Sequence, residues 1–245
     1  MNSILFYFIF ILLSFLILGV SIKIIPKEAM FTIAIGAVIG SNIYNSINYP
    51  IDILGLNFGI DSIVYTIFMF CLLLMYIDYG KKDFKALLYT SLFSILFTAF
   101  LYFMGTFSQQ GYSLSLLLST LSYINSIIGT FLGAFAMIKV YDFLKKKNCN
   151  IYINIFLCMI VASLINSLIY FVLTFIINHS IIDSMLISLA GSYIGKLISS
   201  LLCLLIFFLH TFKSKKTKEK IKQTNEENIE NSIDNNTDNN TDNKK

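Results

Sequence analysis

The last long apolar run of the chain, residues 183–211, carries one charged residue deep inside it, Lys196. A run of this length fits the hydrocarbon core of a bilayer, which a helix of about 20 apolar residues crosses. A lysine in the middle of a spanning helix costs on the order of 3 kcal/mol on insertion scales, so such residues are rare and often functional. The run therefore predicts a membrane protein with a candidate polar site in its last span.

Helical spacing puts this lysine on a polar side of the predicted helix. That side is shared by Ser192, Lys196, Ser199, Ser200 and Cys203, while leucine and isoleucine supply the lipid-compatible remainder. Lys196 is therefore expected to face protein or water. The alternative, which stays open, is a lysine that snorkels or bonds nearby backbone carbonyls and has only a structural role.

The composition excludes an ordinary soluble domain. Of the 245 residues, 56% are hydrophobic, and the mean hydropathy is +0.75. The net charge of +4 comes from lysines in short loops and at the start of the tail, which does not indicate a nucleic-acid surface. No spacing of Cys, His or acidic residues suggests a metal site, a cofactor or a catalytic centre, so we do not expect an enzyme.

Seven apolar runs predict an all-α, polytopic transmembrane helical bundle of about seven spans. The runs cover residues 4–22, 29–47, 62–79, 86–105, 114–141, 151–177 and 183–211. The first run lacks a basic start and a small-residue cleavage site, so we expect a retained helix and not a cleaved signal.

The lysines predict the orientation of these spans. They follow the first, third, fifth and seventh runs and are missing from the loops after the second, fourth and sixth. By the positive-inside rule, the N-terminus is expected outside and the C-terminus in the cytoplasm. The predicted organisation is a first transmembrane helix and cytoplasmic loop at 1–28, a six-helix core at 29–212, and a disordered tail at 213–245 that is first lysine-rich and then Asn- and Asp-rich.

Polar residues inside the predicted spans form the candidate substrate-binding site. The set comprises Lys196, Asn42, Asn166, Asn125, Tyr170 and Ser192. An amide offers donors and an acceptor and a lysine offers donors, which suits the edge of a polar planar solute. The alternative is interhelical hydrogen bonding by these side chains, worth roughly 0.6 kcal/mol each.

Two further patterns bear on this site. Asp61, Asp78 and Asp183 all fall near predicted helix ends, so Lys196 is expected to have no internal counter-charge. Three GxxxG patterns, which let helix backbones approach closely, indicate a packed bundle; they are at Gly36 and Gly40, Gly129 and Gly133, and Gly191 and Gly195.

Four segments together carry a family resemblance: SNIYNS with Asn42, IVYTIFMFCLLLMYIDYGKKD, SLINSLIYFVLTFI, and GSYIGKLISSLL with Lys196. They resemble the VUT family, the queuosine-precursor transporters of bacteria. The resemblance covers most of residues 30–210 and implies a compact bundle of six or seven helices that imports 7-deazapurine precursors without an ATPase of its own. The chain departs from the family pattern at Leu73, Ile77 and Asn166, where the family has acidic residues.

The leading interpretation is a small uptake transporter of the cell membrane, with membrane lipid and a small-molecule solute as its partners and with homo-oligomerisation left open. One rival is a non-transporting membrane sensor or anchor derived from the same bundle. The other is the substrate-binding subunit of an ATP-driven vitamin importer, which would require ATPase and scaffold subunits.

Overall fold

A computed structural model of the chain describes residues 2–24, 26–47, 51–53, 56–110, 114–178, 186–209 and 211. The chain divides into two compact units, Met1–Leu204 and Leu205–Lys245. In the second unit, the Thr211 hydroxyl donates to the carbonyls of Phe207 and Phe208, both at 3.0 Å. The predicted tail at 213–245 lies outside the described residues, and everything that follows concerns the first unit.

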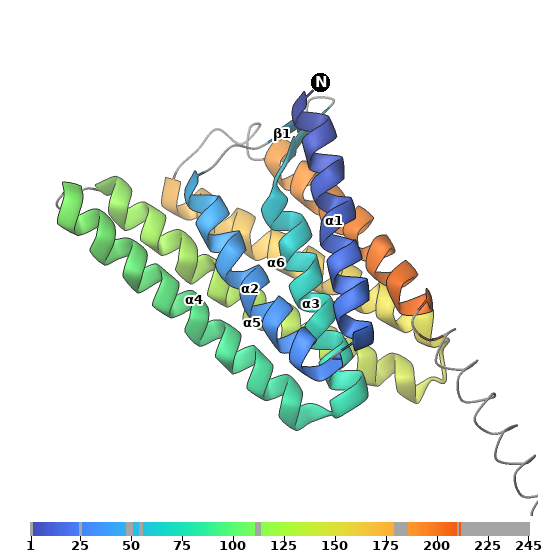
Figure 1. The fold of residues 1–245 in the computed structure, drawn as a ribbon. Helices are drawn as coiled ribbons and strands as arrows, with labels where there is room; N and C mark the ends of the chain where they lie inside the picture. The colour runs from blue at the N-terminus through green and yellow to red at the C-terminus, as the bar shows by residue number, and fades with distance from the viewer. Residues whose placement is uncertain are drawn as a thin grey trace, which may run out of the picture. The chain divides into compact units, whose positions relative to one another are not determined.

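The unit is a bundle of long helices in which successive helices run in opposite directions (Figure 1). The helices are α1 (Asn2–Ile24), α2 (Pro26–Ile47), α3 (Ile60–Tyr79), α4 (Lys81–Gln110), α5 (Leu114–Lys146), α6 (Ile151–Asn178) and the part up to Leu204 of a final helix at Leu186–Leu209. Among the described residues, five are long and apolar enough to cross a membrane: α3, most of α4, the second part of α5, most of α6, and the final helix. The prediction of a helical bundle is confirmed, and the five apolar helices are consistent with a membrane protein.

Several helices extend beyond the apolar runs that predicted them. α4 begins at Lys81 instead of residue 86, and α5 continues to Lys146 instead of ending at residue 141. The reason is that hydropathy marks the stretch that suits lipid, whereas lysine is itself a good helix former and continues the helix into the polar region.

A short hairpin between α2 and α3 was not predicted. Strand β1 (Ile51–Ile53) pairs antiparallel with β2 (Leu56–Phe58), with Asp52 opposite Asn57 in the register. The hairpin leaves the predicted all-α fold class unchanged, because its two strands have three residues each. Strands of three residues are too short for the alternating pattern that would indicate a strand in the sequence.

Helix α3 forms the centre of the bundle. Its apolar window is 72% buried, against 28–33% for the other four candidate spans. It packs against α2 and α4 and also contacts α5 and α6. A helix that is apolar all round suits such a central position, because each of its faces meets another helix.

The turn from α3 to α4 depends on a glycine. Gly80 has φ 88°, a conformation that residues with a Cβ rarely adopt, and its N–H donates to the carbonyl of Met75. α4 begins with the next residue, Lys81.

Polar and aromatic contacts tie the helices together at this end of the bundle. The Tyr76 hydroxyl donates to the Asp142 carboxylate of α5 at 2.8 Å. Lys27 of α2 forms a 3.0 Å salt bridge with Asp83 of α4 and lies 5.4 Å above the Tyr79 ring of α3. These contacts connect α2, α3, α4 and α5.

Candidate functional site

Lys196 of the final helix lies inside the bundle, with only 4% of its surface exposed. Its Nζ donates to Asn166 Oδ1 and to Ser167 Oγ of α6, each at 2.8 Å. Consecutive residues on α6 thus supply two acceptors to one ammonium group. These are charge-assisted hydrogen bonds, which are stronger than those between neutral groups.

Tyr65 of α3 completes the surroundings of the lysine. Lys196 Nζ lies 4.9 Å from the centroid of the Tyr65 ring, a distance at which the ring face attracts a cation. The Tyr65 hydroxyl points on to α6, where it donates to the Ala162 carbonyl at 3.4 Å. Lysine and tyrosine therefore link α3, α6 and the final helix around one point.

Glycines on α5 make room for these polar side chains. A Cβ added to Gly129 would lie 2.7 Å from Asn166 Nδ2, and one added to Gly133 would lie 2.8 Å from the Tyr65 hydroxyl. Real Cβ atoms do not approach other atoms this closely. The second GxxxG pattern of the sequence is therefore part of the wall of the site.

Asp61 is an acidic residue close enough to Lys196 for the two to interact electrostatically. It is in the first turn of α3, near the helix end as expected. The neighbouring Ser62 Oγ lies 3.0 Å from Ser192 Oγ, a contact that brings α3 against the final helix.

The structure places the six predicted site residues differently. Lys196 and Asn166 are hydrogen-bonded, and Ser192 lies one helical turn before the lysine and contacts Ser62. Asn125 is buried on α5, one turn before Gly129. Tyr170 lies one helical turn after Asn166 on the same side of α6, but it is 49% exposed. The buried part of this side therefore ends before Tyr170. Asn42 belongs to α2, and its side chain lies outside the described residues.

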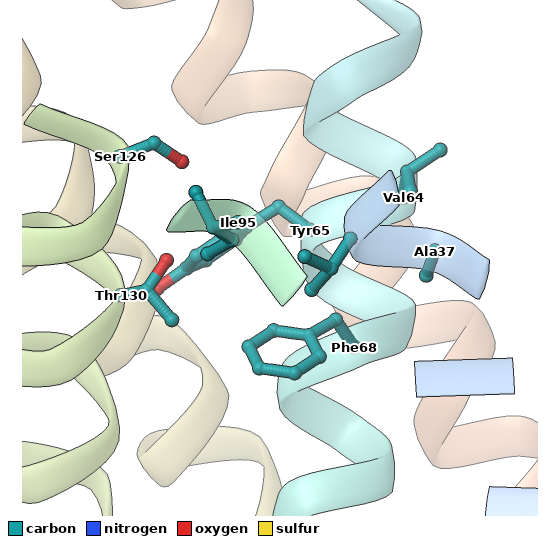
Figure 2. Close-up of a pocket in the computed structure, with 8 residues that line it drawn as sticks. Ala37, Val64, Tyr65, Phe68, Ile95, Ser126 and Thr130 are labelled. Atoms are coloured by element: carbon teal, nitrogen blue, oxygen red, sulfur yellow. The ribbon is translucent and has the colours of Figure 1, made fainter. Parts of the chain in front are cut away.

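A small cavity adjoins the site on the far side of Tyr65. Its volume is about 20 Å³, which is room for one water molecule. Figure 2 shows Tyr65 extending across it toward Thr130, with Phe68 and Ser126 also at its wall. The cavity is bounded by α2, α3, α4 and α5 and has hydroxyl groups on an otherwise apolar lining.

One further hydroxyl lies close to Lys196 along the final helix. Ser199 is buried, and its Oγ finds no hydrogen-bond partner in the described part of the chain. The next residue, Ser200, instead donates to the Lys196 carbonyl at 2.7 Å.

Tyr65, Ser167 and Asp61 were not predicted as site residues. Ser167 adjoins Asn166 on the polar side of α6, and this adjacency was the available signal. Tyr65 lies within an apolar run. The sequence of such a run does not indicate which neighbouring helix the tyrosine hydroxyl will face. Asp61 was set aside because of its place at a helix end, although the end of one helix can lie beside the middle of another.

Ammonium, amide, hydroxyl and aromatic groups converge in this arrangement, which gives it hydrogen-bond donors and acceptors for a polar group. Within the searched residues, no group of three His, Cys, Asp or Glu side chains could hold a metal ion. No family model, curated protein or solved structure matches the chain. The resemblance to the queuosine-precursor transporters therefore stays a prediction.

Proposed function

We propose that the chain is a multi-pass transporter of the bacterial cell membrane that takes up a purine-like queuosine precursor of the 7-deazaguanine type. The observation that carries the proposal is the buried Lys196, held by Asn166 and Ser167 over the ring of Tyr65. An ionisable residue buried among spanning helices is costly, and such residues mark solute and ion pathways.

The donors and acceptors of this site suit an edge of a planar heterocycle. Lys196 and the amide of Asn166 offer hydrogen bonds to ring nitrogens and carbonyl oxygens, and the Tyr65 ring offers an aromatic face. The resemblance of the segments around Asn42 and Lys196 to the precursor transporters supports the same class of solute. Seven spans with the N-terminus outside agree with the lysine distribution.

The proposal requires the site to open. A cavity of about 20 Å³ holds one water molecule, so a purine-sized solute needs α3, α6 and the final helix to separate. The described arrangement is then a closed one. Glycines at the contact between α5 and α6 allow close packing of helices that rock against one another in transport.

The decisive experiment measures queuosine in tRNA. A bacterial strain that neither makes nor imports the precursors is supplied with nanomolar 7-deazaguanine precursors, with and without the protein. We expect queuosine only when the protein is present, and its absence from cells whose membranes contain the protein would contradict the proposal.

The first prediction concerns Lys196 in the same assay. Lys196→Ala removes the donor that faces the solute, so we expect queuosine to fall to the level of cells without the protein, while the variant remains in the membrane at normal abundance. Lys139→Ala, which changes an exposed lysine on α5, is the matched control and is expected to keep full uptake. Full uptake by Lys196→Ala would remove the lysine from the site.

A further inference from the structure

The start of α4 carries three exposed lysines. Lys81, Lys82 and Lys85 all lie within the first five residues of the helix. Among the described residues, none of the three forms a salt bridge or lies over an aromatic ring. Their ammonium groups can therefore bind a partner from outside the chain.

Nearby acidic side chains do not neutralise this lysine cluster. Asp83 is the acidic residue in the first turn of α4, and it pairs with Lys27 of α2 at 3.0 Å. Asp78, near the end of α3, contributes one negative charge against the three lysines. The cluster thus keeps a net positive charge, which suits an anionic group.

Two exposed lysines at the end of α5 are arranged differently. Lys145 Nζ lies 6.0 Å from the centroid of the Tyr141 ring, and Lys147 Nζ lies 4.6 Å from that of the Phe143 ring. Aromatic rings of the chain itself therefore attract these two cations. They offer a comparison of equal charge for the lysine cluster of α4.

An exposed apolar stripe continues from the lysine cluster along α4. Steps of three, four and seven residues, which keep to one side of a helix, lead from Lys82 and Lys85 to Tyr89, Phe93 and Phe100. All three aromatic side chains are exposed, Phe93 by 70%. Lysine followed by tyrosine and then phenylalanine matches the order of headgroup, interface and acyl chain in one leaflet of a bilayer.

We propose that this side of α4 binds an anionic phospholipid through the lysine cluster and the aromatic stripe below it. The ammonium groups bind the phosphate and the rest of the negatively charged headgroup, and the aromatic side chains pack against an acyl chain. A soluble phosphate compound would contact only the lysines, so the continuity of the two surfaces favours a lipid. The inference does not depend on which solute the chain takes up.

The test is native mass spectrometry of the purified full chain in detergent, with dioleoyl phosphatidylglycerol and dioleoyl phosphatidylcholine as probes. The two lipids share their acyl chains and differ in net charge. With each of three lysines worth about fivefold, wild-type protein should bind phosphatidylglycerol about 100-fold more tightly than phosphatidylcholine. In the double variant Lys82→Gln and Lys85→Gln, one lysine remains, and the preference should fall to about fivefold.

Two controls accompany this measurement. The double variant Lys145→Gln and Lys147→Gln removes the same charge from the end of α5 and should keep the wild-type preference. All four lysines are exposed, so neither double variant disturbs the core. Glycerophosphoglycerol, which is the headgroup without acyl chains, should not displace bound phosphatidylglycerol even in excess.

Each other outcome would overturn the inference. Equal binding of the two lipids by wild-type protein would exclude recognition of the charged headgroup. An equal loss of preference in the two double variants would mean attraction to the overall charge, without a site on α4. Displacement by glycerophosphoglycerol would assign the lysines to soluble phosphate compounds. None of these results bears on the uptake assay, so the proposed function stands or falls separately.

Discussion

At the scale of single residues, the buried lysine depends on hydrogen bonds that cross between helices. Two of the three N–H donors of Lys196 meet oxygens of α6, and its ammonium group lies over the ring of Tyr65. The sequence showed that Lys196 and Asn166 belong to polar sides of their helices. It could not show that they bond each other, because the rotation and depth of one helix against another depend on packing along their whole length.

Removal of the amide acceptor should destabilise the protein measurably. Asn166→Ala leaves Lys196 with one side-chain oxygen fewer, so we expect the free energy of unfolding to fall by about 1.5–3 kcal/mol, as for hydrogen bonds to charged groups. Unfolding of the purified protein in mixed micelles by a denaturing detergent measures this. Leu168→Ala, on the exposed side of the same helix, should change it by only about 0.5 kcal/mol. Equal losses in both variants would mean that the bond to Lys196 contributes little.

At the scale of helices, glycine patterns that look alike in the sequence differ in what surrounds them. Nothing lies within 4 Å of a Cβ built at Gly36 or Gly40 of α2, whereas α5 has Asn166 and Tyr65 pressed against Gly129 and Gly133. A GxxxG pattern predicts that a close approach is allowed, and the neighbour that approaches is decided by the fold. The long apolar runs of the sequence predicted that the helices exist. They did not predict where the helices end or that the short hairpin forms, because neither feature has a distinctive hydropathy pattern.

The two glycine pairs supply a matched experiment. Gly133→Ala places a methyl group against the Tyr65 hydroxyl and 3.2 Å from the Ala162 carbonyl, so α5 and α6 must move apart. We expect loss of uptake and a free energy of unfolding lower by about 1–3 kcal/mol, the range for overpacked cores.

Gly36→Ala should raise the free energy of unfolding, whereas Gly133→Ala should lower it. With open space around it, the added methyl group only improves the helix, by about 0.5–1 kcal/mol, and uptake should be unchanged. Destabilisation by Gly36→Ala, or none by Gly133→Ala, would contradict this account of the two surfaces.

At the scale of the whole molecule, the lysine distribution predicts which end of the bundle faces the cytoplasm. The turn between α5 and α6, with Cys149 exposed, should lie inside, and the exposed Ser108 near the end of α4 should lie outside. The sequence supports this orientation through the positive-inside rule.

Labelling with a membrane-impermeant maleimide tests the orientation. In intact cells, wild-type protein should stay unlabelled, because Cys149 is internal and Cys71, Cys158 and Cys203 are buried. Ser108→Cys should be labelled in intact cells, and Cys149 should react only in inverted vesicles or permeabilised cells. Labelling of Cys149 from outside would reverse the predicted topology.

The hydrogen bonds from Lys196 to Asn166 and Ser167 also have a consequence for binding. A ligand acceptor that replaces one of these two oxygens at the ammonium group breaks one hydrogen bond for each that it makes. The exchange therefore contributes to the affinity only the difference in free energy between the new hydrogen bond and the one that is displaced.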